Sequence, residues 1–80
     1  MKPYRLTKPA EVAFANELRA ARLHAKIGKS ELARRACMTR QGLEKIERGD
    51  GVTLGTIALL ANALGCQIAD LFPRKSPWQF

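Results

Sequence analysis

The segment spanning residues 30–49, SELARRACMTRQGLEKIERG, most constrains what this chain can fold into, because it reads as two short helices joined by a tight turn. Its apolar residues recur at helical spacing and can all face one core: Leu32, Ala33, Ala36, Met38, Leu43 and Ile46. Polar residues remain on or near the opposite side: Arg40, Gln41, Glu44, Lys45 and Arg48. The second helix is thereby presented outward, with a face that suits a DNA groove.

Apolar residues recur at the same spacing elsewhere, which predicts helices on both sides of this pair. The expected helices span residues 9–25, 29–36, 40–48 and 54–64, and a short fifth helix or turn spans 67–72. Eighty residues give room for one domain with a modest core. The sequence therefore predicts an all-α, compact five-helix domain. Its expected parts are a basic N-terminal arm at 1–8, the helix-turn-helix domain at 9–72 and a flexible C-terminal tail at 73–80.

The ends of these helices carry specific signals. Thr39 and Thr53 stand where a side-chain oxygen can accept from an orphan backbone N–H at the start of a helix. Gly49 and Gly65 follow the last apolar positions, where glycine adopts the left-handed conformation that other residues resist. Pro73 cannot continue a helix. These signals predict the bounds of the third, fourth and fifth segments.

Positive charge is concentrated in the half that holds the helix pair. The formal net charge is +7, and residues 1–48 hold 12 of the 14 basic residues and 5 of the 7 acidic ones. Such an imbalance predicts attraction to a polyanion, with nucleic acid first and an anionic membrane surface second. A solvated basic surface without a partner is the alternative.

Residue content disfavours several classes of function. Cys37, Cys66 and the single His24 cannot supply a four-ligand zinc site, and the cysteines lack the close spacing of a redox motif. No Ser/His/Asp, Cys/His or paired-carboxylate arrangement is evident. The uncharged run 51–69 contains glycine and polar residues, so a soluble helix explains it better than a membrane span, and the N-terminus lacks the apolar run of a secretory signal. We therefore expect no metal, no cofactor and no enzymatic activity, in a reduced cytoplasmic protein.

Several motifs combine along the chain: Leu18 with Arg22, Leu32-Ala33, Cys37-Met38-Thr39, Ile46-Glu47-Arg48-Gly49, and Ala61-x-x-Leu64-Gly65 leading to Asp70-Leu71-Phe72. With these motifs, residues 11–72 resemble the Cro and phage-repressor family of five-helix DNA-binding domains, often called the Xre family. In that family the second helix crosses the phosphate backbone and the third enters the major groove.

The resemblance implies a role for each matching residue. The implied base readers are Arg40, Gln41, Glu44 and Lys45, and the implied phosphate ligands are Lys29, Ser30, Thr39 and Arg48. Glu44 would either accept from cytosine or hold a neighbouring basic side chain, and Ser30 would either bind phosphate or satisfy only its own helix end. Arg22 and Glu47 fall at the positions of a structural ion pair, and if this pair is buried, removal of one partner would leave an uncompensated charge.

The chain departs from the family at a few positions. Cys37 stands in the turn where the family often has glycine, so a positive φ there would be strained. Gly42 lies inside the recognition helix, where it weakens the helix but permits close approach to DNA. Leu59 and Phe72 are candidate dimer contacts, although an isolated exposed leucine needs no partner. Trp78 and Phe80 in the tail pose the same choice.

Two functions are compatible with these residues. The first is a sequence-specific transcriptional repressor that binds a two-fold operator as a homodimer through the major groove, with its readers about 34 Å apart. Lys2, Arg5 and Lys8 would form an arm that wraps the DNA or is merely solvated. The second is an antitoxin or another interaction module of the same fold, which binds a toxin or a transcription partner through Leu59 or the tail. The two functions can coexist.

Overall fold

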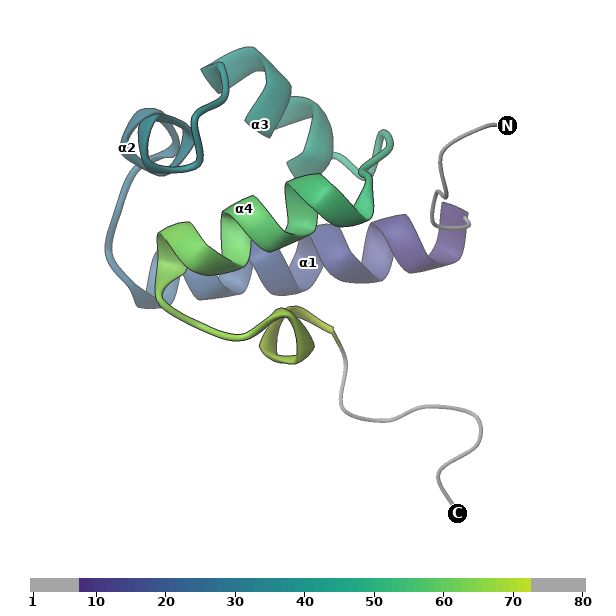
Figure 1. Ribbon diagram of the computed structural model, residues 1–80. Coiled ribbons are helices and arrows are strands. Elements are labelled where there is room, and N and C mark those ends of the chain that lie inside the picture. The colour runs from purple at the N-terminus through teal and green to yellow at the C-terminus, as the bar shows by residue number, and fades with distance from the viewer. Residues whose placement is uncertain (1–7, 73–80) are drawn as a thin grey trace.

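The computed structural model describes residues 8–72. Four α-helices and one 3-10 helix follow one another along the chain: α1 (Lys8–His24), α2 (Lys29–Arg35), α3 (Arg40–Glu47), α4 (Leu54–Leu64) and η1 (Ile68–Leu71) (Figure 1). The predicted all-α class is confirmed, and the fifth segment is a single 3-10 turn. Each predicted α-helix is present, with its bounds shifted by one residue at most.

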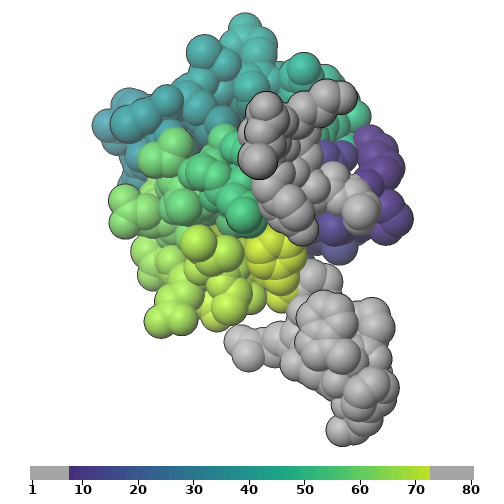
Figure 2. All heavy atoms as spheres, turned by 45° about the vertical axis from the view of Figure 1, so that its right-hand side comes forward, coloured from purple at the N-terminus to yellow at the C-terminus, as the bar shows by residue number. Residues whose placement is uncertain are grey.

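The helix pair α2 and α3 lies above α1 and α4 in the view of Figure 1. α3 contacts both α2 and α1, while α2 also contacts α4. η1 contacts α1 and α4, and Figure 2 shows it beneath α4. The outer face of α3 is therefore carried on a support made of the other helices.

The core forms where the apolar stripes of the helices meet. Its fully buried side chains come from every element: Phe14, Leu18, Leu32, Leu43, Ile57, Leu60 and Leu71. Phe72 packs against Phe14, with ring centroids 5.5 Å apart and planes tilted by 40°. Met38, from the turn, is only partly buried at the edge of this core. Phe72 therefore contributes to the monomer core, although sequence reasoning offered it as a dimer contact.

The predicted helix signals are confirmed by hydrogen bonds and backbone angles. The Thr39 hydroxyl accepts from the backbone N–H of Gly42 at 3.0 Å, and the Thr53 hydroxyl accepts from that of Thr56 at 3.3 Å. Gly49 and Gly65 have φ values of +83° and +70°. Both glycines thus take the left-handed conformation that ends a helix.

Two residues other than glycine also have positive φ. Cys37, in the turn between α2 and α3, has φ +58°, the positive value that the sequence analysis considered for this position. Lys26, between α1 and α2, has φ +61° and was not foreseen. At both residues the backbone adopts a left-handed conformation that favours glycine.

Lys8 belongs to α1, although the sequence placed it in the N-terminal arm. Its Nζ donates to the carbonyl oxygen of Gly49 at 2.6 Å and lies 3.4 Å from a carboxylate oxygen of Asp50. It therefore connects the start of α1 to the loop between α3 and α4. Residues 1–7 and 73–80, with Lys2, Arg5, Trp78 and Phe80, lie outside the described residues.

Candidate nucleic-acid interface

α3 turns one face into the core and the other to solvent. Leu43 is fully buried and Ile46 is 7% exposed, which fixes the rotation of the helix about its axis. Arg40, Gln41 and Lys45 are exposed in consequence. Three of the four implied base readers therefore stand together on an outward face.

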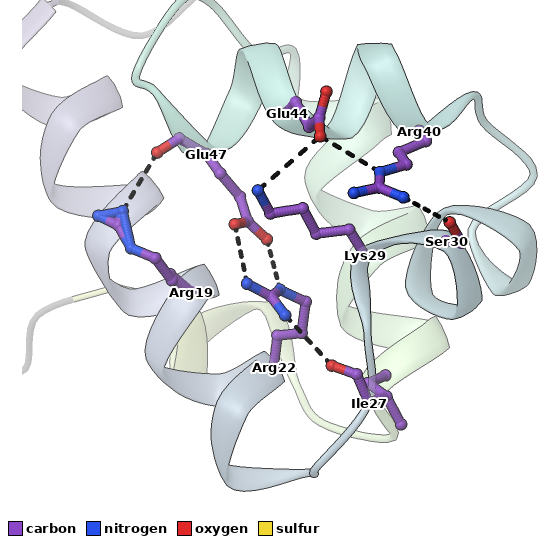
Figure 3. A network of polar contacts seen from close by, with 8 residues as sticks. All are labelled: Arg19, Arg22, Ile27, Lys29, Ser30, Arg40, Glu44 and Glu47. Atoms are coloured by element: carbon purple, nitrogen blue, oxygen red, sulfur yellow. Dashed lines mark hydrogen bonds and ion pairs between the residues drawn. The ribbon is translucent and has the colours of Figure 1, made fainter.

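Glu44, the fourth implied reader, is half-buried and joins two basic side chains. Its Oε2 lies 3.2 Å from Nε of Arg40 and 3.8 Å from Nζ of Lys29 (Figure 3). Nη1 of Arg40 also donates to the Ser30 hydroxyl at 3.4 Å. The start of α2 and the outer face of α3 are thus connected by polar contacts, and of the two roles considered for Glu44, this geometry matches the holding of basic neighbours.

The implied phosphate ligands lie at the edges of the same surface. Lys29 and Ser30 begin α2, and Lys29 keeps 38% of its side chain exposed while paired with Glu44. The Thr39 oxygen caps α3, so its hydroxyl hydrogen is the part that can donate to an anion. Arg48 is exposed, with Nε 3.4 Å from Oδ2 of Asp50. Hydrogen bonds from Lys8 and Arg48 lower the pKa of Asp50.

The ion pair between Arg22 and Glu47 fastens α1 to the end of α3. Nε and Nη2 of Arg22 donate to the two carboxylate oxygens of Glu47 at 2.8 and 3.2 Å. The two residues are only 7% and 6% exposed. Nη1 of Arg22 also donates to the carbonyl oxygen of Ile27 at 3.2 Å. This pair supports the orientation of α3 from inside the molecule.

Other charged residues near this surface were missed in the sequence. Glu31 accepts hydrogen bonds from Arg34 and Arg35, and these bonds lower the pKa of Glu31. Their spacing of three and four residues on one helix is a signal that could have found them. Nη1 of Arg19 donates to the carbonyl oxygen of Glu47 at 3.3 Å. This contact joins residues 28 positions apart, so no local sequence pattern predicts it.

A contact within the protein explains why position 42 is glycine. A Cβ at this position would lie 3.1 Å from Oγ1 of Thr39, the oxygen that caps α3. A larger residue would therefore crowd the start of the helix. The sequence suggested a second reason, close approach of the backbone to DNA, which stays a prediction.

Three large apolar side chains of α4 and η1 are exposed. Leu54, Leu59 and Ile68 keep 49%, 48% and 43% of their surface exposed. Residues 51–69 carry no charged residue, while Asp70 in η1 is exposed. Exposed apolar side chains also occur on α1, where Leu23 is 62% exposed, so Leu59 stays a predicted contact with another protein.

Two further properties concern the described residues. None of their helices is long and apolar enough to cross a membrane. Within residues 8–72, no group of three or more His, Cys, Asp or Glu side chains comes together in a way that could hold a metal ion.

The fold and the outward face of α3 define a DNA-binding regulator of the helix-turn-helix class. A sequence profile of the helix-turn-helix family matches residues 18–71, and the chain belongs to this family, in its Cro and phage-repressor (Xre) branch. No curated protein sequence matches the chain.

Solved structures give more particular likenesses. The restriction-modification controller protein C.AhdI from Aeromonas hydrophila is 32% identical, with a TM-score of 0.75, over 78% of this chain and 96% of that one. The clp gene regulator ClgR from Corynebacterium glutamicum is 27% identical, with a TM-score of 0.74, over 78% of this chain and 82% of that one. A hydroxypropylphosphonic acid epoxidase from S. wedmorenis is 29% identical, with a TM-score of 0.78, but the match covers 38% of the enzyme.

Proposed function

We propose that the chain is a sequence-specific transcriptional repressor that binds a two-fold operator as a homodimer. The observation that carries the proposal is the outward face of α3, where Arg40, Gln41 and Lys45 are exposed above a buried apolar side. Arg40 and Lys45 donate to guanine and Gln41 pairs with adenine, while Glu44 accepts from cytosine or orients Arg40. The similarity to C.AhdI, a restriction-modification controller protein, and to ClgR, a clp gene regulator, supports a regulatory function.

Affinity comes from phosphate contacts around this reading face. Lys29, Ser30, Thr39 and Arg48 flank α3 and supply donors to the DNA backbone. A dimer places two α3 helices about 34 Å apart, one turn of the duplex, so each subunit reads one half-site. Leu59, which keeps 48% of its surface exposed on α4, provides the contact between the two copies. The protein acts in the cytoplasm as a binding protein, with no catalytic step.

Selection from a pool of random duplexes tests this function. We expect a two-fold motif to be enriched, and the affinity for it to fall steeply as salt rises. Lys29→Gln should weaken binding to all duplexes alike, because a phosphate contact carries no sequence information. Lys26→Gln removes the same charge outside the proposed interface and serves as the matched control. Absence of an enriched motif, or binding indifferent to salt, contradicts the proposal.

The exposed Leu59 also supports a second function, that of an antitoxin or another interaction module. In that case Leu59 contacts a toxin or a transcription partner in place of a second copy. Co-expression with proteins encoded beside this chain distinguishes the two. Stoichiometric recovery of a small partner protein favours the interaction module, and a homodimer that binds the selected duplex favours the repressor.

A further inference from the structure

A charged hollow lies beside α3, and it includes Arg19, a residue that the sequence did not assign to DNA. It has a volume of about 420 Å³ and is bordered by the second half of α1, the start of α2 and the end of α3. Its lining side chains are all charged: Arg19, Arg22, Lys29, Glu44, Glu47 and Arg48. Figure 3 shows the first five of these, with the Arg22–Glu47 pair between Arg19 on one side and Lys29 and Glu44 on the other.

The two acidic residues of this hollow are already matched by basic partners. Glu47 uses both carboxylate oxygens for Arg22, at 2.8 and 3.2 Å. Glu44 is shared by Lys29 and by Arg40, which stands outside the lining. The charges that remain are therefore positive, and the hollow favours an anion.

Arg19 is the basic lining residue whose charge no carboxylate of residues 8–72 compensates. Its two hydrogen bonds there go to neutral acceptors: Nη2 donates to Oδ1 of Asn16 at 2.8 Å, and Nη1 to the backbone carbonyl of Glu47 at 3.3 Å. These bonds hold the guanidinium in place. A guanidinium has five N–H donors, so donors remain for a tetrahedral anion, and the prior ordering lowers the entropy that binding must overcome.

We propose that this hollow binds a phosphate group, with Arg19 as its principal ligand and Lys29 and Arg48 at its rim. The inference rests on the proposed function in one respect, that the phosphate belongs to the backbone of the bound duplex. Lys29 and Arg48 are shared by the hollow and the reading surface, so a duplex seated on α3 can present a flanking phosphate to Arg19. In this arrangement α1 contributes a phosphate contact in addition to those of α2 and α3.

The first test measures binding of the selected duplex and of a random duplex by the full chain as salt is varied. Arg19→Gln should weaken both complexes by roughly 5- to 10-fold at about 0.1 M salt, and should reduce the slope of log K against log salt by about 0.9, the value for one phosphate. Lys26→Gln, which removes an equal charge away from the hollow, should change the slope by much less. Equal slopes for Arg19→Gln and Lys26→Gln would overturn the proposal.

The second test needs no DNA. Inorganic phosphate is added to isotopically labelled protein while the side-chain Nε–H signal of Arg19 is followed by NMR. We expect a saturable shift in the wild type, together with shifts of residues 29 and 48, and loss of those two shifts in Arg19→Gln. An Arg19 signal indifferent to phosphate overturns the site.

The two arms separate this inference from the proposed function. If the wild type binds no duplex, the repressor proposal fails, while the phosphate titration still decides the hollow. If Arg19→Gln does not fold, Arg19→Lys replaces it, because lysine keeps the charge but not the planar fork. We expect Arg19→Lys to keep the wild-type salt slope with weaker affinity for phosphate, and wild-type affinity in Arg19→Lys would contradict a ligand role for the guanidinium.

Discussion

At the scale of single residues, the turn of the helix pair holds a side chain where glycine fits better. Cys37 has φ +58°, a conformation that disfavours a Cβ by about 1–2 kcal/mol. Glycine is also freer in the unfolded chain, which returns part of that gain. Cys37 therefore adds strain to the segment that positions α3.

Replacing this residue with glycine should stabilise the domain. We expect Cys37→Gly to raise the free energy of unfolding by about 0.5–1 kcal/mol, and the thermal midpoint by several degrees. Thermal unfolding followed by circular dichroism measures the change. Cys37→Ala removes the thiol but keeps the Cβ, so it should give no comparable rise. A midpoint that falls or stays unchanged in the glycine variant contradicts the interpretation.

The buried ion pair is the other residue-scale feature on which the fold depends. Arg22→Ala leaves the Glu47 carboxylate buried without its partner, which should lower stability by about 3–5 kcal/mol. Denaturation in urea measures the loss. Arg34→Ala breaks an exposed pair with Glu31 and should leave the midpoint nearly unchanged. Similar midpoints for the two variants would show that burial of the first pair does not matter.

At the scale of helices, the sequence predicted what local chemistry determines. The bounds of α3 and α4 follow from Thr39, Thr53 and the two terminal glycines, because a cap acts within one turn of the chain. Lys8 shows where such reasoning ends. Its contact with Gly49 joins residues 41 positions apart, so its helix position and its partner depend on the packing of the whole domain.

We expect the Thr39 cap to limit fraying at the start of α3. Thr39→Ala removes the oxygen that accepts from the backbone N–H of Gly42, and should lower stability by about 1 kcal/mol. Thr39→Ser retains that oxygen and should remain near the wild type. Amide hydrogen exchange at residues 40–43 measures fraying directly. Unchanged exchange in the alanine variant would contradict a role for the cap.

At the scale of the domain, charged and uncharged segments are separated along the chain. Residues 1–48 hold 12 of the 14 basic residues, while residues 51–69, which include the exposed Leu59 of α4, carry no charge. The sequence predicted that Leu59 would be exposed. It did not indicate the proposed phosphate contact of Arg19, because the hollow forms where three helices meet.

We propose that self-association uses Leu59 on α4. Leu59→Asp should convert the proposed dimer into a monomer and weaken binding to a two-half-site duplex, since each copy then binds without its neighbour. Sedimentation velocity measures the oligomeric state. Leu23→Asp alters an exposed leucine on α1 and should leave the dimer intact. A dimer that persists in the Leu59 variant would place the contact elsewhere.

The proposed function depends on base reading by the exposed side chains of α3. The most direct measurement is selection of random duplexes by the wild type and by Gln41→Ala under the same salt. We predict that the variant keeps the two-fold motif but loses its preference at one base pair in each half-site. An identical motif in both proteins, at every position, would contradict base reading by Gln41.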